Sequence, residues 1–129
     1  MRRTTGGLRL IKGLHHVQLA MPRDAEHRAR AFYCGVLGFE EVEKPAILKG
    51  RGGAWFTCSG IELHMGVEEP FSPAKKAHPA FRVASLDQMM RHLEDQGVPY
   101  RRDVDLPNLR RVYVDDPFGN RIELLEQIE

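Results

Sequence analysis

The sequence predicts an α+β fold in which two βαβββ modules form a cupped, incomplete mixed β-barrel with helices on the outside. Three observations lead to this prediction. Apolar and polar residues alternate in short runs typical of strands, and a helical repeat follows the first run in each half. The same order of elements then occurs twice along the chain. With 129 residues, of which 42% are hydrophobic, the chain can bury a core of this kind.

The predicted organisation divides the chain into four segments. They are a tail over residues 1–13, a first module over 14–66, a connector over 67–77 and a second module over 78–129. The connector contains Pro70 and Pro73 and shows no apolar periodicity, which is typical of a linking segment.

The first module begins with a predicted strand at Leu14–Met21, with His15 on its apolar side and His16 on its polar side. Asp24 is the predicted N-cap of a helix whose apolar positions continue to Val36. Three more strands are predicted at Phe39–Lys44, Ala54–Cys58 and Ile61–Gly66.

The second module repeats this order. A strand is predicted at His78–Ala84, and Ser85 with Gln88 suggests a capping box for a helix that stops at Gly97. Three strands follow, at Val98–Arg102, Arg111–Asp115 and Arg121–Gln127. The turn at Asp116–Asn120 contains Pro, Gly and Asn, the residue types that tight turns favour.

Four ligand-type side chains lie on the polar faces of otherwise apolar strands. They are His16, Glu62, His78 and Glu123. Glu62 follows His16 by 46 positions and Glu123 follows His78 by 45, as a duplicated unit predicts. Imidazole nitrogen and carboxylate oxygen suit one divalent ion such as Zn, Ni, Co, Mn or Fe(II). His64 lies two residues after Glu62 on the same face and is the alternative fourth ligand.

Catalytic and substrate-binding residues are predicted around this metal. An acidic ligand on a labile ion can also accept a proton, so Glu123 and Glu62 are the predicted catalytic bases. The substrate-binding candidates are Arg82, Trp55, Tyr113 and Arg121. The two arginines could steer an anionic substrate, or each could form a salt bridge with a carboxylate on a neighbouring strand.

The composition limits the classes of binding partner that are expected. Charged residues make up 29% of the chain but leave a net charge of only +1, so neither nucleic acid nor a membrane surface is an expected partner. A small-molecule substrate is expected instead. Cys34 and Cys58 form no CxxC motif, and no apolar run suits a signal peptide or a membrane span, so a cytoplasmic location is expected.

The chain resembles the vicinal oxygen chelate superfamily, which includes glyoxalase I, extradiol dioxygenases, methylmalonyl-CoA epimerase, fosfomycin-resistance transferases and bleomycin-binding proteins. The resemblance to glyoxalase I is carried by the segments Leu14–Leu19, Ile61–Leu63, Lys76–Val83 and Asp116–Leu124. By this resemblance, the metal ligands of glyoxalase I correspond here to His16, Glu62, His78 and Glu123.

The resemblance implies a metal-dependent lyase or isomerase that holds a small substrate through adjacent oxygens and stabilises an enolate-like intermediate. One alternative is an extradiol-type dioxygenase or a fosfomycin-resistance-type thiol transferase that uses only His16, His78 and Glu123. Another is a metal-free binding protein of the bleomycin resistance type. A homodimer is expected, with each site either within one chain or shared between two.

Overall fold

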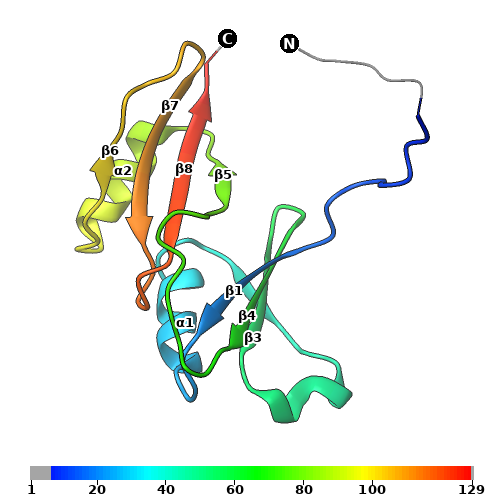
Figure 1. Cartoon of the computed structure of the whole chain (residues 1–129). Helices are drawn as coiled ribbons and strands as arrows, with labels where there is room; N and C mark the ends of the chain where they lie inside the picture. Colours follow the sequence, from blue (N-terminus) through cyan, green and yellow to red (C-terminus); the bar gives the residue numbers. More distant parts are fainter. Residues whose placement is uncertain (1–6, 129) are drawn as a thin grey trace.

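The computed structural model describes residues 7–128, which form two four-stranded mixed sheets, each with one α-helix (Figure 1). The first sheet and its helices comprise β1 (Val17–Met21), α1 (Glu26–Tyr33), β2 (Glu40–Val42), the 3₁₀ helix η1 (Ala46–Arg51), β3 (Ala54–Cys58) and β4 (Ile61–Val67). The second comprises β5 (Ala80–Arg82), α2 (Leu86–Asp95), β6 (Arg101–Arg102), β7 (Leu109–Asp115) and β8 (Arg121–Gln127).

The two sheets have the same topology. Their strand orders are β1-β4-β3-β2 and β5-β8-β7-β6, with the first and last strands of each half parallel and the other pairs antiparallel. The predicted α+β class and the repeated strand-helix-three-strand order are therefore confirmed. The sheets do not join into a closed barrel, as expected for a cupped and incomplete one.

Period-2 alternation explains which face of each sheet is buried. The fully buried strand residues include Met21, Leu63, Val112, Val114 and Ile122. They pack with the apolar faces of the helices, which contribute Ala29, Phe32, Tyr33, Leu86 and Leu93. The opposite faces of the sheets carry the polar side chains that the sequence singles out.

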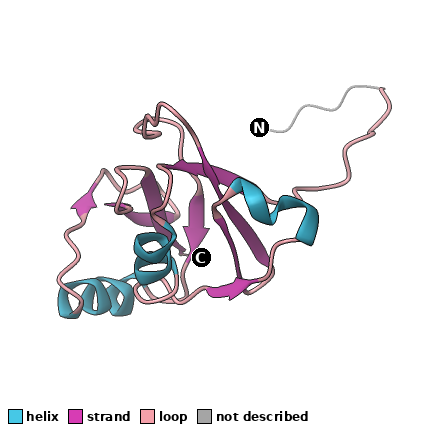
Figure 2. Ribbon diagram, turned by 90° about the horizontal axis from the view of Figure 1, so that it is seen from below, coloured by secondary structure: helices cyan, strands magenta, loops and turns pink. Residues whose placement is uncertain are grey.

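The predicted start of the first strand was wrong. The strand begins at Val17 and not at Leu14, because residues 7–16 extend away from both sheets and pair with no described strand (Figures 1 and 2). Leu14 is 83% exposed. His15, predicted on the apolar side, is likewise exposed, because alternation orients a side chain only where the backbone is paired.

Helix ends also differ from the predictions. Asp24 does not cap α1: its φ is 63°, and the N-cap position belongs to Ala25 without a side-chain hydrogen bond. The helix ends at Tyr33, three residues before Val36. At α2 the N-cap half of the predicted capping box is present, since Ser85 Oγ accepts a hydrogen bond from the backbone N–H of Gln88 at 3.1 Å.

A buried polar network joins the two halves at the turn before β8. Asp116 accepts hydrogen bonds from the Tyr33 hydroxyl at 2.7 Å and from the Asn120 side chain at 2.9 Å. Asn120 also donates to the carbonyl of Ala20 in β1 at 2.8 Å. All three polar side chains are buried. The turn therefore sets the position of the second sheet relative to β1 and α1.

None of the helices in the described part of the chain is long and apolar enough to cross a membrane.

Candidate metal and substrate site

The second sheet brings one predicted pair of ligands into contact. His78 lies just before β5 and Glu123 lies in β8, which pairs with β5 in parallel. The His78 Nε2 atom is 2.9 Å from Glu123 Oε1. The imidazole is half-buried and the Glu123 side chain is only 8% exposed. Residues 45 positions apart in the sequence thus share one small site.

The chemistry of this contact requires a cation. His78 Nδ1 is 2.7 Å from the carbonyl oxygen of Lys76, which can only accept, so Nδ1 carries the hydrogen. In a neutral imidazole, Nε2 then presents a lone pair toward a carboxylate that also only accepts. A proton or a metal ion must compensate for the repulsion. Imidazole nitrogen and carboxylate oxygen are both ligands of divalent metals, so the donor types of this pair would suit such an ion.

Three side chains of β7 and the preceding loop surround the pair. Arg111 Nη1 lies 3.5 Å from Glu123 Oε2, the oxygen that does not face His78. The Tyr113 ring meets the His78 ring edge-to-face, with centroids 5.4 Å apart. Asp103 accepts from the Tyr113 hydroxyl at 3.2 Å and pairs with Arg111 at 3.3 Å. The carboxylate is therefore held at one oxygen, while the other stays next to the imidazole.

The first sheet gathers a different group, which consists of stacked aromatic rings. His64 lies between His16, at a centroid distance of 4.2 Å, and Trp55, at 3.8 Å. His64 is buried and His16 is exposed. Burial lowers the pKa of His64, and so does the neighbouring His16, although Glu62 opposes the shift. A lowered pKa favours the neutral imidazole, which is the form that binds metals.

His15 belongs to this group although the sequence analysis did not include it. Its Nδ1 lies 3.0 Å from Nδ1 of His16. The only signal in the sequence was the adjacency of two histidines, and the predicted alternation pointed them to opposite faces.

One chain does not bring the four predicted ligands together. Among residues 7–128, no group of three or more His, Cys, Asp and Glu side chains is placed to hold a metal ion. The structure instead holds two partial sites, the His16–His64 pair on the first sheet and the His78–Glu123 pair on the second. The four-ligand site stays a prediction, and the sequence analysis left open whether one chain or two would complete it.

The strand register bears on the choice between Glu62 and His64. In the second sheet, the residue two positions after His78 pairs with Glu123. In the first sheet, the residue two positions after His16 pairs with His64. His64 therefore occupies the place in the first sheet that Glu123 occupies in the second, whereas Glu62 lies two residues earlier on β4 and is half-buried.

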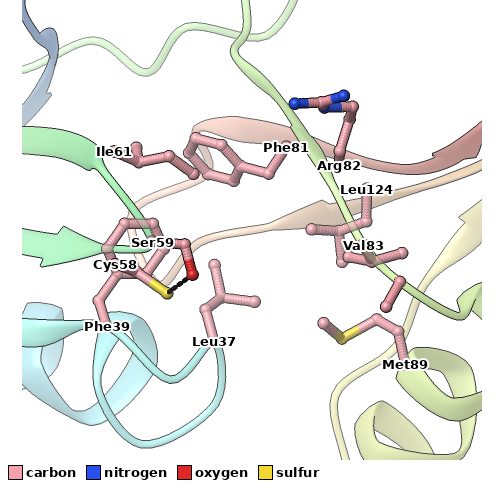
Figure 3. A pocket seen from close by; sticks show the side chains of 11 residues that line it. Leu37, Phe39, Cys58, Ser59, Ile61, Phe81, Arg82, Val83, Met89 and Leu124 are labelled. Carbon is pink, nitrogen blue, oxygen red and sulfur yellow. Dashed lines mark hydrogen bonds between the residues drawn. The ribbon is translucent and has the colours of Figure 1, made fainter.

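Arg82 lies away from both pairs, at the edge of an apolar pocket between the two halves (Figure 3). It donates a hydrogen bond to Gln127 at 3.1 Å. The pocket has a volume of about 260 Å³. It is lined from the first half by Leu37, Phe39, Cys58, Ser59 and Ile61 and from the second half by Phe81, Val83, Ala84, Met89 and Leu124. It contains none of the predicted metal ligands.

Comparison with known proteins gives one family. The sequence model of the Glyoxalase/Bleomycin resistance protein/Dioxygenase superfamily matches residues 13–124. A solved structure from Bacillus anthracis, described as a glyoxalase family protein, is 49% identical and has a TM-score of 0.90. The match covers 94% of this chain and 99% of that one. No curated protein matches the chain.

More distant structures share the fold. A glyoxalase/dioxygenase from Nostoc punctiforme is 24% identical, with a TM-score of 0.75 over 98% of this chain and 100% of its own. The fosfomycin resistance protein FosX from Listeria monocytogenes is 21% identical, with a TM-score of 0.70 over 91% of this chain and 94% of its own. At these identities the likeness establishes the architecture and leaves the reaction open.

Proposed function

The chain belongs to the Glyoxalase/Bleomycin resistance protein/Dioxygenase superfamily, and from this premise we propose that it is a divalent-metal-dependent enzyme acting on a small molecule. The observation that supports the metal is the contact between His78 Nε2 and Glu123 Oε1 at 2.9 Å, which brings two ligand-type side chains from different strands together. The favoured reaction is that of a lyase or isomerase.

The proposed ligands are His16, His78 and Glu123, with His64 or Glu62 as the fourth. The register equivalence with Glu123 and the contact with His16 favour His64. A divalent ion bound there would act as a Lewis acid toward two adjacent oxygens of a substrate. Its identity among Zn, Ni, Co, Mn and Fe(II) depends on whether the set is three imidazoles and one carboxylate or two of each.

Glu123 is the proposed base. One of its oxygens faces His78 and the other lies near Arg111, so the carboxylate is oriented from both sides. A carboxylate held in this way can accept a proton when a substrate acid comes within hydrogen-bond reach. Glu62, the second predicted base, lies on the first sheet next to the stacked rings.

We propose that a homodimer completes the site, with the first sheet of one subunit facing the second sheet of its partner. Two observations support this. The partial sites of one chain do not share a cluster, and four apolar side chains of the extended segment 7–16 are open to solvent. They are Leu8, Leu10, Ile11 and Leu14, each at least 79% exposed. A second copy is the simplest surface to cover them.

We also propose that the protein is located in the cytoplasm. Both cysteines, Cys34 and Cys58, are free thiols, which fits a reducing compartment such as the cytoplasm.

Metal content tests the proposal. Protein purified without a metal-chelating tag is expected to contain close to one divalent ion per chain, measured by elemental analysis. The variants His78→Ala and Glu123→Gln each remove one proposed ligand. Each should lower the metal content per chain by about tenfold or more, because the remaining donors bind the ion too weakly. His27→Ala removes an exposed histidine of α1 and serves as the matched control. Wild-type protein that neither contains nor takes up metal would favour the binding-protein alternative.

A second pair of variants separates the reaction classes. If His64→Gln lowers metal content and Glu62→Gln does not, His64 is the fourth ligand; the reverse result restores Glu62. If neither substitution lowers the metal content, the site has three ligands, as the dioxygenase and thiol-transferase alternatives require. Activity of each variant toward hemithioacetals, catechols, acyl-CoA epimers and fosfomycin with a thiol then identifies the reaction.

A further inference from the structure

Three arginines surround the ring of Tyr113 on the face of the second sheet that carries His78 and Glu123. The guanidinium carbons of Arg101, Arg111 and Arg121 lie 5.8, 5.9 and 4.8 Å from the ring centroid. Such a concentration of cations beside a functional pair needs compensating charge. The structure shows where that charge comes from for two of the three.

Arg101 and Arg111 have carboxylate partners. Arg101 binds Asp115 through two hydrogen bonds of 3.0 and 3.2 Å. Arg111 pairs with Asp103 at 3.3 Å and approaches Glu123 at 3.5 Å. These contacts are the strand-to-strand salt bridges expected when an arginine has only a structural role.

Arg121 has no carboxylate within ion-pair distance in residues 7–128, and the carboxylate opposite it in the sheet is bound by another arginine. In the β7–β8 register Asp115 lies directly opposite Arg121, the position from which a cross-strand ion pair usually forms. Asp115 binds Arg101 instead. Arg121 takes part in none of the ion pairs formed within residues 7–128.

The Nε–H group of Arg121 is the clearest sign of a missing ligand. Nε is buried and has no hydrogen-bond partner, the only side-chain nitrogen or oxygen in the described part of the chain in this state. An unsatisfied buried donor costs about 1–3 kcal/mol, and more when it is charged. The ring of Tyr113 stabilises the cation from one face but accepts nothing in the guanidinium plane.

The position of Arg121 relates this donor to the proposed site. Arg121 is two residues before Glu123 on the same face of β8, and Tyr113 contacts both Arg121 and His78. A group bound in the plane of the guanidinium would therefore lie next to the His78–Glu123 pair without being held by either residue.

We propose that Arg121 binds a carboxylate group of the substrate, at a place separate from the adjacent oxygens that meet the metal. Nε–H and the neighbouring Nη–H form the edge of the guanidinium that matches a carboxylate with two parallel hydrogen bonds. That the bound carboxylate belongs to a substrate rests on the proposed function. It narrows the substrate class to small carboxylic acids that also carry two adjacent oxygen donors.

Anion binding to metal-free protein tests this assignment. Chelator-treated full-length protein, labelled with ¹⁵N-arginine, is titrated with acetate at constant ionic strength and followed by NMR. The Nε–H resonance of Arg121 should shift saturably, while those of Arg101 and of Arg91, an exposed residue of α2, should not. In Arg121→Gln the Tyr113 ring resonances report binding, and acetate affinity should fall by about tenfold or more. Arg91→Gln, which removes an exposed arginine of α2, should stay within about twofold of wild type.

Arg121→Lys keeps the charge but loses the planar edge of the guanidinium, so its affinity for acetate should also fall. If Arg121→Gln does not fold, Arg121→Lys is measured in its place. An unmoved Arg121 resonance, or wild-type affinity in either variant, would overturn the assignment. Because the measurement is made without metal, its outcome is independent of the metal content of the His78 and Glu123 variants. Failure of one proposal is thus distinguishable from failure of the other.

Discussion

At the scale of single residues, Asp116 shows how one buried acceptor organises its surroundings. It is 4% exposed, and its carboxylate accepts from the backbone N–H groups of Phe118 and Asn120 at 2.9 Å as well as from two side chains. Burial and the neighbouring carboxylate raise the pKa of Tyr33 well above its ordinary value, so the phenol remains a donor. This local order keeps the turn before β8 in one conformation, and Glu123 follows in that strand.

Replacing Tyr33 with Phe should lower the free energy of unfolding by about 1.5–3 kcal/mol, because a buried charged acceptor loses one donor. The matched control is Tyr100→Phe, which removes an exposed hydroxyl that donates to Glu94 and should leave the free energy of unfolding nearly unchanged. Denaturant titration of both variants measures the difference. If both variants lost the same free energy of unfolding, the buried Tyr33 hydrogen bond would contribute no more to stability than the exposed one.

Residue chemistry also explains which site predictions could be made in advance. An imidazole or a carboxylate in an otherwise apolar run is visible in the sequence, so residue type and the matched offsets of the two halves could place His78 and Glu123 in one predicted site. The stack of His16, His64 and Trp55 could not, because ring stacking depends on which strands become neighbours.

At the scale of elements, the periodicity identified the strands and helices, but their ends depended on contacts with other elements. β1 begins at Val17, which pairs with Leu63, although β4 starts two residues earlier at Ile61; β6 contains only Arg101–Arg102 because its pairing with β7 is that short. The helix η1 was not predicted; it lies between β2 and β3, next to the close approach of Gly53 to β4.

Gly53 illustrates such an approach. Its φ is +86°, and a Cβ atom there would lie 2.2 Å from the backbone oxygen of Met65 in β4. Gly53 N–H also donates to Glu26 of α1 at 2.8 Å. This residue therefore needs both the backbone conformation and the small size of glycine, and it precedes the strand that positions Trp55.

Gly53→Ala should destabilise the protein by about 3 kcal/mol or more, from backbone strain together with the clash on β4. Gly60→Ala is the control: its φ is +82°, but nothing lies within 4 Å of the added Cβ, so only the strain of about 1–2 kcal/mol should remain. Thermal or chemical unfolding compares the two. A Gly53 variant no less stable than the Gly60 variant would contradict the steric explanation.

At the scale of the whole molecule, the two sheets repeat one topology but carry different chemistry. The first holds stacked imidazoles beside Trp55, and the second holds the His78–Glu123 pair within a network of arginines and carboxylates. Because no group of three such ligands forms within residues 7–128, we propose that two chains combine their partial sites in a dimer.

Mixed dimers test this requirement. His16→Ala and Glu123→Gln should each lack the complete site, but refolding an equal mixture should restore about a quarter of wild-type metal content, because each mixed dimer regains one intact site of two. Metal analysis after refolding gives the measurement. If the site lay within one chain, the mixture would hold no more metal than the separate variants.

The sequence by itself determined the α+β class, the repeated strand order and the residue types available for a metal, because periodicity and side-chain chemistry are local properties. Only the tertiary structure decided the strand ends, the stacking of His64 between His16 and Trp55, the capture of Asp115 by Arg101 and the separation of the two partial sites. These features depend on which backbone segments become neighbours, and that choice is made by packing over the whole molecule.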